Sequence, residues 1–255
     1  MGTNGKRIIR KCRLKLTAPL YYLLVTQGYP RKQSLDLIFS HPSILESSIC
    51  KNLANRCIHP AHLNVKIRGK RVQPETVTKL AIDLLNVTAT IYAATRNEPV
   101  FKCTDGVVRD ILSSKQAVRT LQTQMEESTE ILRLLRKPYP NLQRIVLVID
   151  SQIPWSKQIA LKSLEALKQE SWEFEVAVSR SADRSLIELS KKGFVIATSD
   201  IVVLQNIDRF TDIPSELSRT NIIKMEPVDL ETIIAEGLDE TINKAKNPSI
   251  TLGCK

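Results

Sequence analysis

The stretch Arg144-Ile-Val-Leu-Val-Ile-Asp150 is the clearest indication of the fold. Its apolar residues are continuous, which is typical of a strand covered on both faces. Other short β-prone runs follow Pro74, at Leu80–Ile82, Pro99–Cys103, Phe174–Val178, Phe194–Ala197 and Ile222–Met225. Long amphipathic stretches accompany them, at Lys115–Arg136, Ser156–Glu170, Asp183–Lys191 and Asp229–Lys246. This alternation predicts an α/β fold with a mostly parallel sheet flanked by helices.

The N-terminal part of the chain has a different pattern, in which short helical segments alternate with glycine and proline breaks. Apolar residues in Leu20–Val25 recur at helical spacing, and Gly28-Tyr-Pro30 ends that segment. Further helices are expected over Arg31–Ser40 and Ile44–Cys57, before a basic connector at Lys66–Arg71. The predicted organisation is a small basic all-helical module at 1–65, an α/β domain at 74–225, and a C-terminal helix and tail at 226–255.

Positive charge is concentrated at the N-terminal end. Residues 1–80 hold 15 Lys and Arg against 3 Asp and Glu, whereas the rest of the chain holds 22 against 24. This asymmetry is typical of contact with nucleic-acid phosphates or another acidic surface, and a general basic bias is the alternative explanation. The predicted RNA-binding residues are Lys6, Arg7, Arg10, Lys11, Arg13, Lys15, Arg31, Lys32, Lys66, Arg68, Lys70 and Arg71.

Several classes of protein are disfavoured. No run reaches the ~18 apolar residues of a membrane span, and the first 15 residues lack the apolar centre of a secretory signal. We therefore expect a cytoplasmic protein without membrane contact. The sequence contains no P-loop or Gly-x-Gly-x-x-Gly, which disfavours a nucleotide cofactor. Five scattered cysteines predict reduced thiols, and a homo-oligomer remains open.

Acidic side chains follow five of the predicted strands. Asp83, Asp150, Asp183 and Asp200 come after four of them, and Asp105 follows the fifth, with Arg109 and Asp110 a few residues later. The carboxyl ends of parallel strands meet at one edge of a sheet, which is where ligands bind in such folds. Carboxylates gathered there repel one another unless a cation lies among them.

This pattern predicts a site for Mg²⁺ or Mn²⁺, which prefer oxygen ligands. Such ions promote displacement at phosphorus, and the basic N-terminal module would hold the polyanion that is cut. The plainer alternative is that single aspartates here cap helices, Asp183 and Asp200 above all. Asp105-Gly106 is equally consistent with a turn, and Arg109 with a local ion pair to Asp110.

Short motifs, in order along residues 78–206, resemble those of the PIN-like nuclease superfamily, in particular its NYN branch. Ile82-Asp83-Leu-Leu-Asn86-Val resembles its first Asp-x-x-Asn signature, and Val148-Ile-Asp150 takes the place of its middle aspartate. Ser181-Ala-Asp183 resembles its Ala-Asp motif, and Thr198-Ser-Asp200 its Thr-Ser-Asp strand end. The stretches Tyr22–Lys32 and Asp105–Asp110 resemble an uncharacterised archaeal family in which a small helical region of unknown function precedes such a domain.

The resemblance implies a metal-dependent ribonuclease. It implies catalytic roles for Asp83, Asp150, Asp183 and Asp200, the innermost metal ligands being Asp83, Asp150 and Asp200. The supporting residues would be Asn86, Asp105, Arg109, Asp110, Thr198 and Ser199. Apart from the resemblance, Arg109, Arg180 and Lys157 lie close to the motifs in sequence and are alternative candidates for stabilising negative charge in the transition state. Leu84-Leu85 departs from the small or polar pair of the first motif, which implies a less solvated site. An RNA-binding protein that has the fold without the catalysis is therefore the alternative.

Overall fold

A computed structural model describes residues 3–42, 44, 47–111, 133–154, 156–167 and 172–246 of the chain. It has the predicted α/β architecture, with a five-stranded, all-parallel sheet in the order β5-β4-β1-β6-β7. The strands are β1 (Lys79–Asp83), β4 (Arg144–Asp150), β5 (Glu173–Ser179), β6 (Val195–Ala197) and β7 (Phe210–Thr211). The chain winds outward from β1 to β5 and then returns to β6, on the other side of β1. This reversal places the topological switch point of the sheet between β1 and β6.

Helices cover both faces of the sheet because strand side chains alternate between the faces. Leu80, Ile82 and Leu147 belong to one buried cluster, with apolar residues of α6 (Leu84–Thr95), α8 (Ser156–Leu167) and α11 (Ile213–Arg219). Ala81 and Val146 point to the opposite cluster, with residues of α5 (Ala61–Arg68), α9 (Ala182–Lys191) and α10 (Ile201–Asn206). The continuous apolar run of β4 is explained by this double cover.

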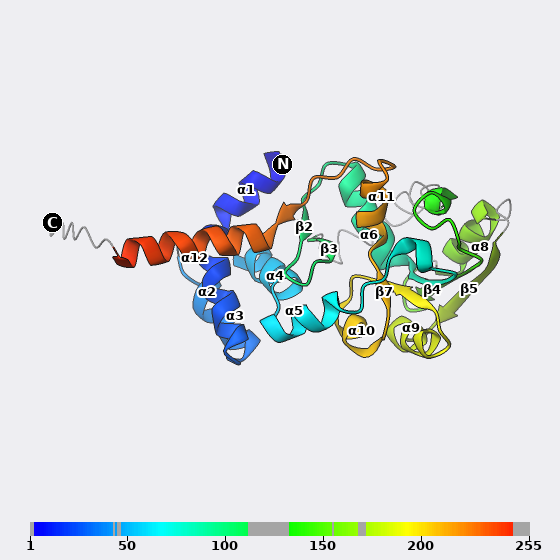
Figure 1. The fold of residues 1–255 in the computed structure, drawn as a ribbon, viewed down its shortest axis with the longest axis horizontal. Helices are drawn as coiled ribbons and strands as arrows, with labels where there is room; N and C mark the ends of the chain where they lie inside the picture. The colour runs from blue at the N-terminus through cyan, green and yellow to red at the C-terminus, as the bar shows by residue number, and fades with distance from the viewer. Residues whose placement is uncertain are drawn as a thin grey trace.

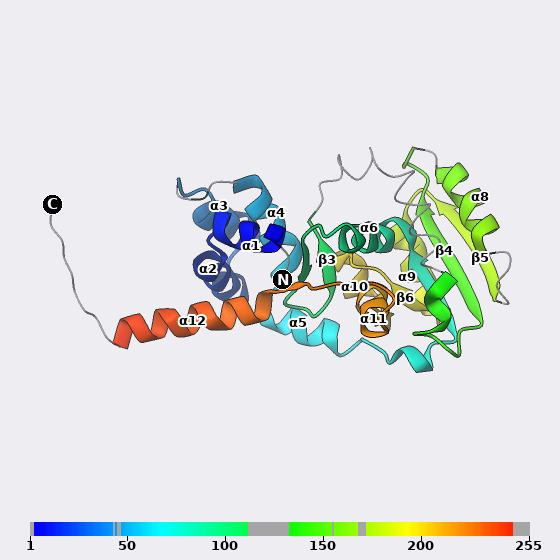
Figure 2. The ribbon, with the colours of Figure 1, turned by 90° about the horizontal axis from the view of Figure 1, so that it is seen from above.

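A second lobe lies at the other end of the molecule (Figure 1). It joins both ends of the chain: α1 (Thr3–Lys11), α2 (Leu14–Thr26), α3 (Arg31–Phe39) and α4 (Ser47–Cys57) share a core with α12 (Leu230–Lys246). The helix α12 lies along α2 in both views (Figures 1 and 2). Gly237 permits this close approach, since a Cβ there would lie 2.1 Å from the Lys15 carbonyl oxygen.

A small sheet contributes to the cores of both lobes, with β2 (Val100–Lys102) between β3 (Val108–Asp110) and β8 (Val228–Asp229). The prediction that Pro99–Cys103 forms a strand of the parallel sheet is therefore wrong. The side chain of Phe101 is fully buried in the core of the helical lobe, and a turn with Gly106 at φ 82° pairs β2 with β3 as a hairpin. The strand expected over Ile222–Met225 is also wrong, because that stretch is irregular.

The basic connector Lys66–Arg71 is not a free linker. Its first residues belong to α5, and Arg71 forms a parallel bridge with Phe210 at the edge of β7. The N–H of Val72 donates to the Phe210 carbonyl at 3.0 Å, and the N–H of Phe210 donates to the Lys70 carbonyl at 3.0 Å. These contacts attach the segment to the large sheet, so the two lobes are joined through α5.

The expectation of reduced cysteines is corrected at one pair. Cys12 and Cys50 form a disulfide between the α1–α2 junction and α4, with Cα atoms 5.5 Å apart. Their separation of 38 residues gave no pairing signal, because the helical packing brings them together. Cys57 and Cys103 are free and buried.

The tail 247–255 and most of the helix expected over Lys115–Arg136 lie outside the described residues. Within the part of the chain that the structure describes, no helix combines the length and apolar character needed to span a membrane.

Candidate functional site: the acidic carboxyl edge

Three neighbouring strands bring aspartates to the carboxyl edge of the large sheet. Asp83 is the last residue of β1 and Asp150 the last of β4, and these strands are paired in parallel. On the other side of β1, the strand β6 leads into Thr198-Ser199-Asp200. Asp83 therefore lies at the centre of the edge and next to the switch point, where open α/β sheets bind their ligands.

Asp83 is the most buried of the four predicted aspartates, with 9% of its surface exposed. Burial raises its pKa to about 6, and the charges of Asp200 and Asp183 act in the same direction. Two hydrogen bonds favour the ionised form and partly oppose this shift in the pKa. Thr198 Oγ1 donates to Asp83 Oδ2 at 2.8 Å, and the backbone N–H of Asn86 donates to the same carboxylate.

Asp183 lies in the first turn of α9, which follows β5. It is not the cap of this helix, because the cap is Ser181, whose hydroxyl accepts from the Arg184 N–H. Burial raises the pKa of Asp183, and the charges of Asp200 and Asp150 raise it further. Asp83 and Asp183 are thus each affected by the charges of other aspartates at this edge.

Asp200 makes two kinds of contact: its side chain caps α10, and its backbone N–H contacts Thr198. Its Oδ1 accepts from the backbone N–H groups of Val202, at 2.6 Å, and Val203, at 3.3 Å, so it caps α10 as the plainer alternative predicted. Its own N–H donates to Thr198 Oγ1 at 3.1 Å. Thr198 therefore bridges Asp200 and Asp83, which connects the β6–α10 loop to the end of β1.

Asn86 and Ser199 also contact each other at the switch point, since the Ser199 hydroxyl donates to Asn86 Oδ1. This bond links the first turn of α6 to the middle of the Thr198–Asp200 loop. Between Asp83 and Asn86, Leu84 is fully buried and Leu85 half-buried. The apolar pair of the first motif therefore belongs to the core of the sheet lobe.

The donor set of the edge fits a divalent ion in its chemistry. Aspartate carboxylates and hydroxyl oxygens are the ligands that Mg²⁺ and Mn²⁺ take. Among the described residues, however, no three carboxylate, imidazole or thiol groups come close enough together to surround one ion. A magnesium ion needs no such group of three, because it is commonly held by one or two carboxylates together with waters and substrate phosphates.

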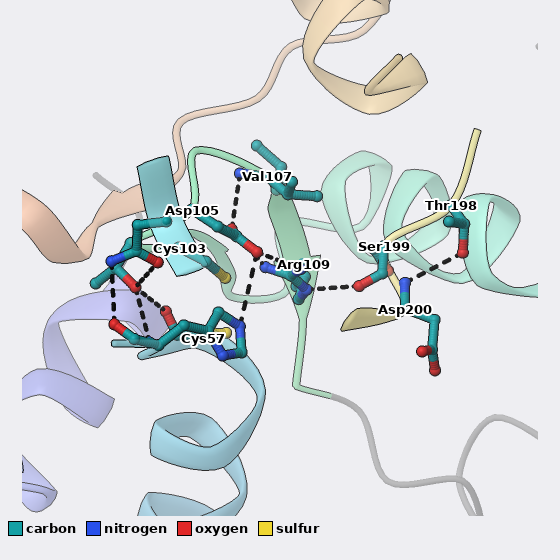
Figure 3. A network of polar contacts seen from close by, with 12 residues as sticks. Cys57, Cys103, Asp105, Val107, Arg109, Thr198, Ser199 and Asp200 are labelled. Carbon is teal, nitrogen blue, oxygen red and sulfur yellow. Dashed lines mark hydrogen bonds and ion pairs between the residues drawn. The ribbon is translucent and has the colours of Figure 1, made fainter. Parts of the chain in front are cut away.

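Asp105, Arg109 and Asp110 lie away from this edge, on the β2–β3 hairpin, and all three are buried. Arg109 forms a bidentate ion pair with Asp105 at 2.8 and 2.7 Å, not with Asp110 (Figure 3). The Nε–H of Arg109 donates to the Ser199 carbonyl oxygen at 2.7 Å, so Arg109 contacts the backbone of the Thr198–Asp200 loop. Asp110 accepts from Thr90 Oγ1 at 3.1 Å and lies 3.7 Å from an Arg56 nitrogen.

Several of the predicted RNA-binding cations make contacts within the protein. Lys15 pairs with Glu236, Arg31 donates to Asn55, and Arg68 contacts Glu231. Lys70 donates to the carbonyls that end α10, and Arg71 pairs with the buried Glu216. Lys11 is half-buried. The remaining members of the predicted set are exposed: Lys6, Arg7, Arg10, Arg13, Lys32 and Lys66.

Asp212 is a buried residue of this edge that the sequence interpretation missed. It follows β7, and its Oδ2 accepts from the Val108 N–H at 3.0 Å and from the Ser215 hydroxyl at 2.6 Å. Burial raises its pKa. A two-residue strand gives no apolar run, so no sequence signal marked Asp212 as another strand-end aspartate.

The fold and this edge define a class: an α/β protein with a doubly wound parallel sheet and an acidic carboxyl edge. Residues 75–216 match the family described as "Domain of unknown function (DUF5616)". The match covers more than half of the chain, so the chain belongs to this family, and it includes every strand of the parallel sheet. No curated protein and no solved structure matches the chain.

Proposed function

We propose that this protein is a Mg²⁺- or Mn²⁺-dependent ribonuclease of the PIN-like type. The observation that carries the proposal is the arrangement of aspartates on neighbouring strands: Asp83 ends β1, Asp150 ends the paired strand β4, and Asp200 follows β6. Asp83 has its pKa raised to about 6 by burial, with contributions from Asp200 and Asp183. Asp183 in turn responds to Asp200 and Asp150. An edge that disfavours its own negative charges in this way is stabilised by a cation.

The chain's own residues would divide the work between binding and orientation. Asp83, Asp150 and Asp200 would hold the ion, with Asp183 in support, and a bound Mg²⁺ or Mn²⁺ would supply positive charge for displacement at phosphorus. Thr198 orients the Asp83 carboxylate through its hydrogen bond of 2.8 Å. The hydrogen bond from the Ser199 hydroxyl to Asn86 Oδ1 would fix the first turn of α6 relative to the β6–α10 loop at the switch point.

The route of the RNA is indicated by α5, which packs against α10. Lys70 donates to the carbonyls at the C-terminal end of α10, and Asp200 caps its N-terminal end. Because α10 has six residues, these ends are about 9 Å apart. Lys66 is exposed on α5, and we propose it as a contact for a phosphate of the RNA that leads towards the acidic edge.

A cleavage assay with metal control tests the proposal. Single- and double-stranded RNAs are incubated with the protein and Mn²⁺, or with EDTA, and metal uptake is measured by calorimetry. We expect the protein to cleave RNA with Mn²⁺ and not with EDTA. The variants Asp83→Asn and Asp150→Asn should not cleave RNA with Mn²⁺. Asp239→Asn, at an exposed position on α12, is the matched control and should cleave normally. Intact RNA in every sample, with no heat of Mg²⁺ or Mn²⁺ binding, would refute the proposal.

RNA binding without cleavage is the second candidate. Two observations favour it: no three ligating groups of the described chain surround an ion, and Leu84, which follows Asp83, is a fully buried apolar residue of the core. In the same experiment, RNA binding that persists with EDTA and in Asp150→Asn, without cleavage, would support this candidate. Both candidates include a cytoplasmic location, which cell fractionation would test.

A further inference from the structure

A buried ion pair lies between the two lobes of the molecule. Asp105 and Arg109 each have 1% of their surface exposed and are joined by two hydrogen bonds, of 2.8 and 2.7 Å. Burying two charges is costly, and an ion pair in the interior is often no better for stability than apolar residues of the same size. Stability alone therefore does not explain this ion pair.

On one side, the pair reaches the acidic edge. The Nε–H of the guanidinium donates to the Ser199 carbonyl oxygen at 2.7 Å (Figure 3). Ser199 is the middle residue of the loop in which Thr198 donates to Asp83 and Asp200 donates to Thr198. Fixing the Ser199 carbonyl therefore fixes the position from which the Thr198 hydroxyl reaches Asp83.

On the other side, the N-terminal helices hold the hairpin that carries the pair. The N–H of His59, just after α4, donates to Thr104 Oγ1 at 2.9 Å, and the Thr104 N–H donates to the Cys57 carbonyl at 2.9 Å. Thr104 Oγ1 also donates to Asn64 Oδ1, on α5, at 3.1 Å. Thr104 immediately precedes Asp105, so the helical module sets the position of the Asp105 carboxylate.

His59 does not compete for that carboxylate. Its Nε2 is 3.6 Å from Asp105 Oδ2, and the two groups form an ion pair only if the imidazole is protonated. Burial and the nearby charge of Arg109 lower the pKa of His59 to about 3. The imidazole is thus neutral at physiological pH, and Arg109 is the cation that Asp105 orients.

We infer that Arg109 is a positioning residue for the acidic edge, held by Asp105 and aligned by the N-terminal helices. The helical module then acts on the site from inside the protein, in addition to any contact with RNA. Calling the edge catalytic rests on the proposed function, but the positioning itself does not. The fork of the guanidinium is essential, because a lysine in its place has a single nitrogen and cannot contact the Asp105 carboxylate and the Ser199 carbonyl in the same way.

The test uses Arg109→Lys, which retains the charge and removes the fork. The readout is amide hydrogen exchange by NMR at Asp200, whose N–H donates to Thr198 Oγ1, compared with amides of the central strand β1. The matched control is Arg71→Lys, which weakens the ion pair with Glu216 without touching the Thr198–Asp200 loop. We expect protection at Asp200 to fall about tenfold in Arg109→Lys, beyond any change at β1, because one charge-assisted hydrogen bond is lost.

A purely structural role for Arg109 predicts a different result, in which protection at Asp200 and β1 falls equally, as in Arg71→Lys. That result would overturn the inference. If Arg109→Lys does not fold, Thr104→Val serves instead, because it retains the ion pair and removes the hydroxyl that His59 contacts. Unchanged protection at Asp200 in Thr104→Val would likewise overturn the inference.

The two proposals can fail separately. Selective loss of protection at Asp200 without any RNA cleavage would support the positioning role and contradict the nuclease proposal. If the protein does cleave RNA, Arg109→Lys should lower kcat and leave KM nearly unchanged, because Arg109 contacts the loop and not the substrate.

Discussion

Asp83 shows at the scale of one residue how a buried carboxylate opposes stability. Its carboxylate is buried at the end of the central strand, and burial raises its pKa to about 6. An unfolded aspartate ionises near pH 3.9, so the native state retains a proton that the unfolded state has already lost. The ionised form of Asp83 therefore costs folding free energy at neutral pH. This cost is expected where a site is arranged to receive a cation.

Asp83→Asn should stabilise the protein at pH 7. Between about pH 4 and pH 6 the native state binds more protons than the unfolded state at this residue, so its contribution to stability falls as pH rises. The amide has no charge to bury, and its oxygen can still accept from Thr198. We expect a gain of about 2 kcal/mol at pH 7 and little change at pH 4, measured by chemical denaturation. Asp239→Asn should change neither value, and an equal gain at both pH values would show that Asp83 does not titrate in this range.

The strand-end aspartates were predictable because each follows an apolar run, and parallel strands end at the same edge. Asp83, Asp150 and Asp200 were found in this way. The surroundings of Arg109 were not predictable. Its partners come from the hairpin turn at Asp105 and from Ser199, which is 90 residues away in the chain. Sequence proximity predicts an ion pair between Arg109 and its neighbour Asp110, whereas the antiparallel hairpin places Arg109 against Asp105.

The β2–β3 hairpin is the element that connects the lobes, and its turn depends on Gly106. This residue has φ 82°, in the left-handed region that a side chain makes strained. Its neighbour Asp105 accepts from the Val107 N–H at 3.1 Å within the same turn, which orients the carboxylate for Arg109. The conformation of one turn thus determines where the buried ion pair lies.

Gly106→Ala should destabilise the protein by about 1–2 kcal/mol, because alanine pays the steric cost of the left-handed conformation. Space is not the cause, since the new Cβ would lie 3.7 Å from the nearest Arg68 atom. The matched variant is Gly69→Ala, where φ is −63° and alanine fits the helical backbone. We expect Gly69→Ala to be neutral or slightly stabilising in thermal denaturation. Equal losses in the two variants would mean that the Gly106 backbone is not the source of the strain.

Long elements were predictable from the sequence and short ones were not. The strand β4 has seven residues and a continuous apolar pattern, so its place inside a covered sheet followed directly. The strands β7 and β8 have two residues each, too few for any periodicity. The β2 run looked like another parallel strand, because an apolar run does not indicate which sheet will contain it. Tertiary contacts of Phe101 with the helical lobe decided this.

At the scale of the whole molecule, the basic helix α1 and the acidic edge belong to different lobes. The helices α1 to α3 lie in one lobe and the strands of the parallel sheet in the other, with α5 between them (Figures 1 and 2). Internal pairing reduces the basic charge available to a ligand, because Lys15, Arg31 and Arg71 are held by groups of the protein. RNA contact by the helical lobe should therefore depend on its exposed cations, chiefly those of α1.

Salt dependence of RNA binding measures how many of these cations contact phosphates. Each phosphate contact to a single strand contributes about −0.7 to the slope of log K against log salt. Replacing Lys6, Arg7 and Arg10 together by alanine should therefore reduce the slope by about 2, in a titration of labelled single-stranded RNA with EDTA present. The matched control replaces three exposed lysines of the sheet lobe, Lys79, Lys191 and Lys192, and should leave the slope nearly unchanged. The opposite pattern would place the RNA on the sheet lobe alone, and the positive charge of α1 would then have a purpose other than binding RNA.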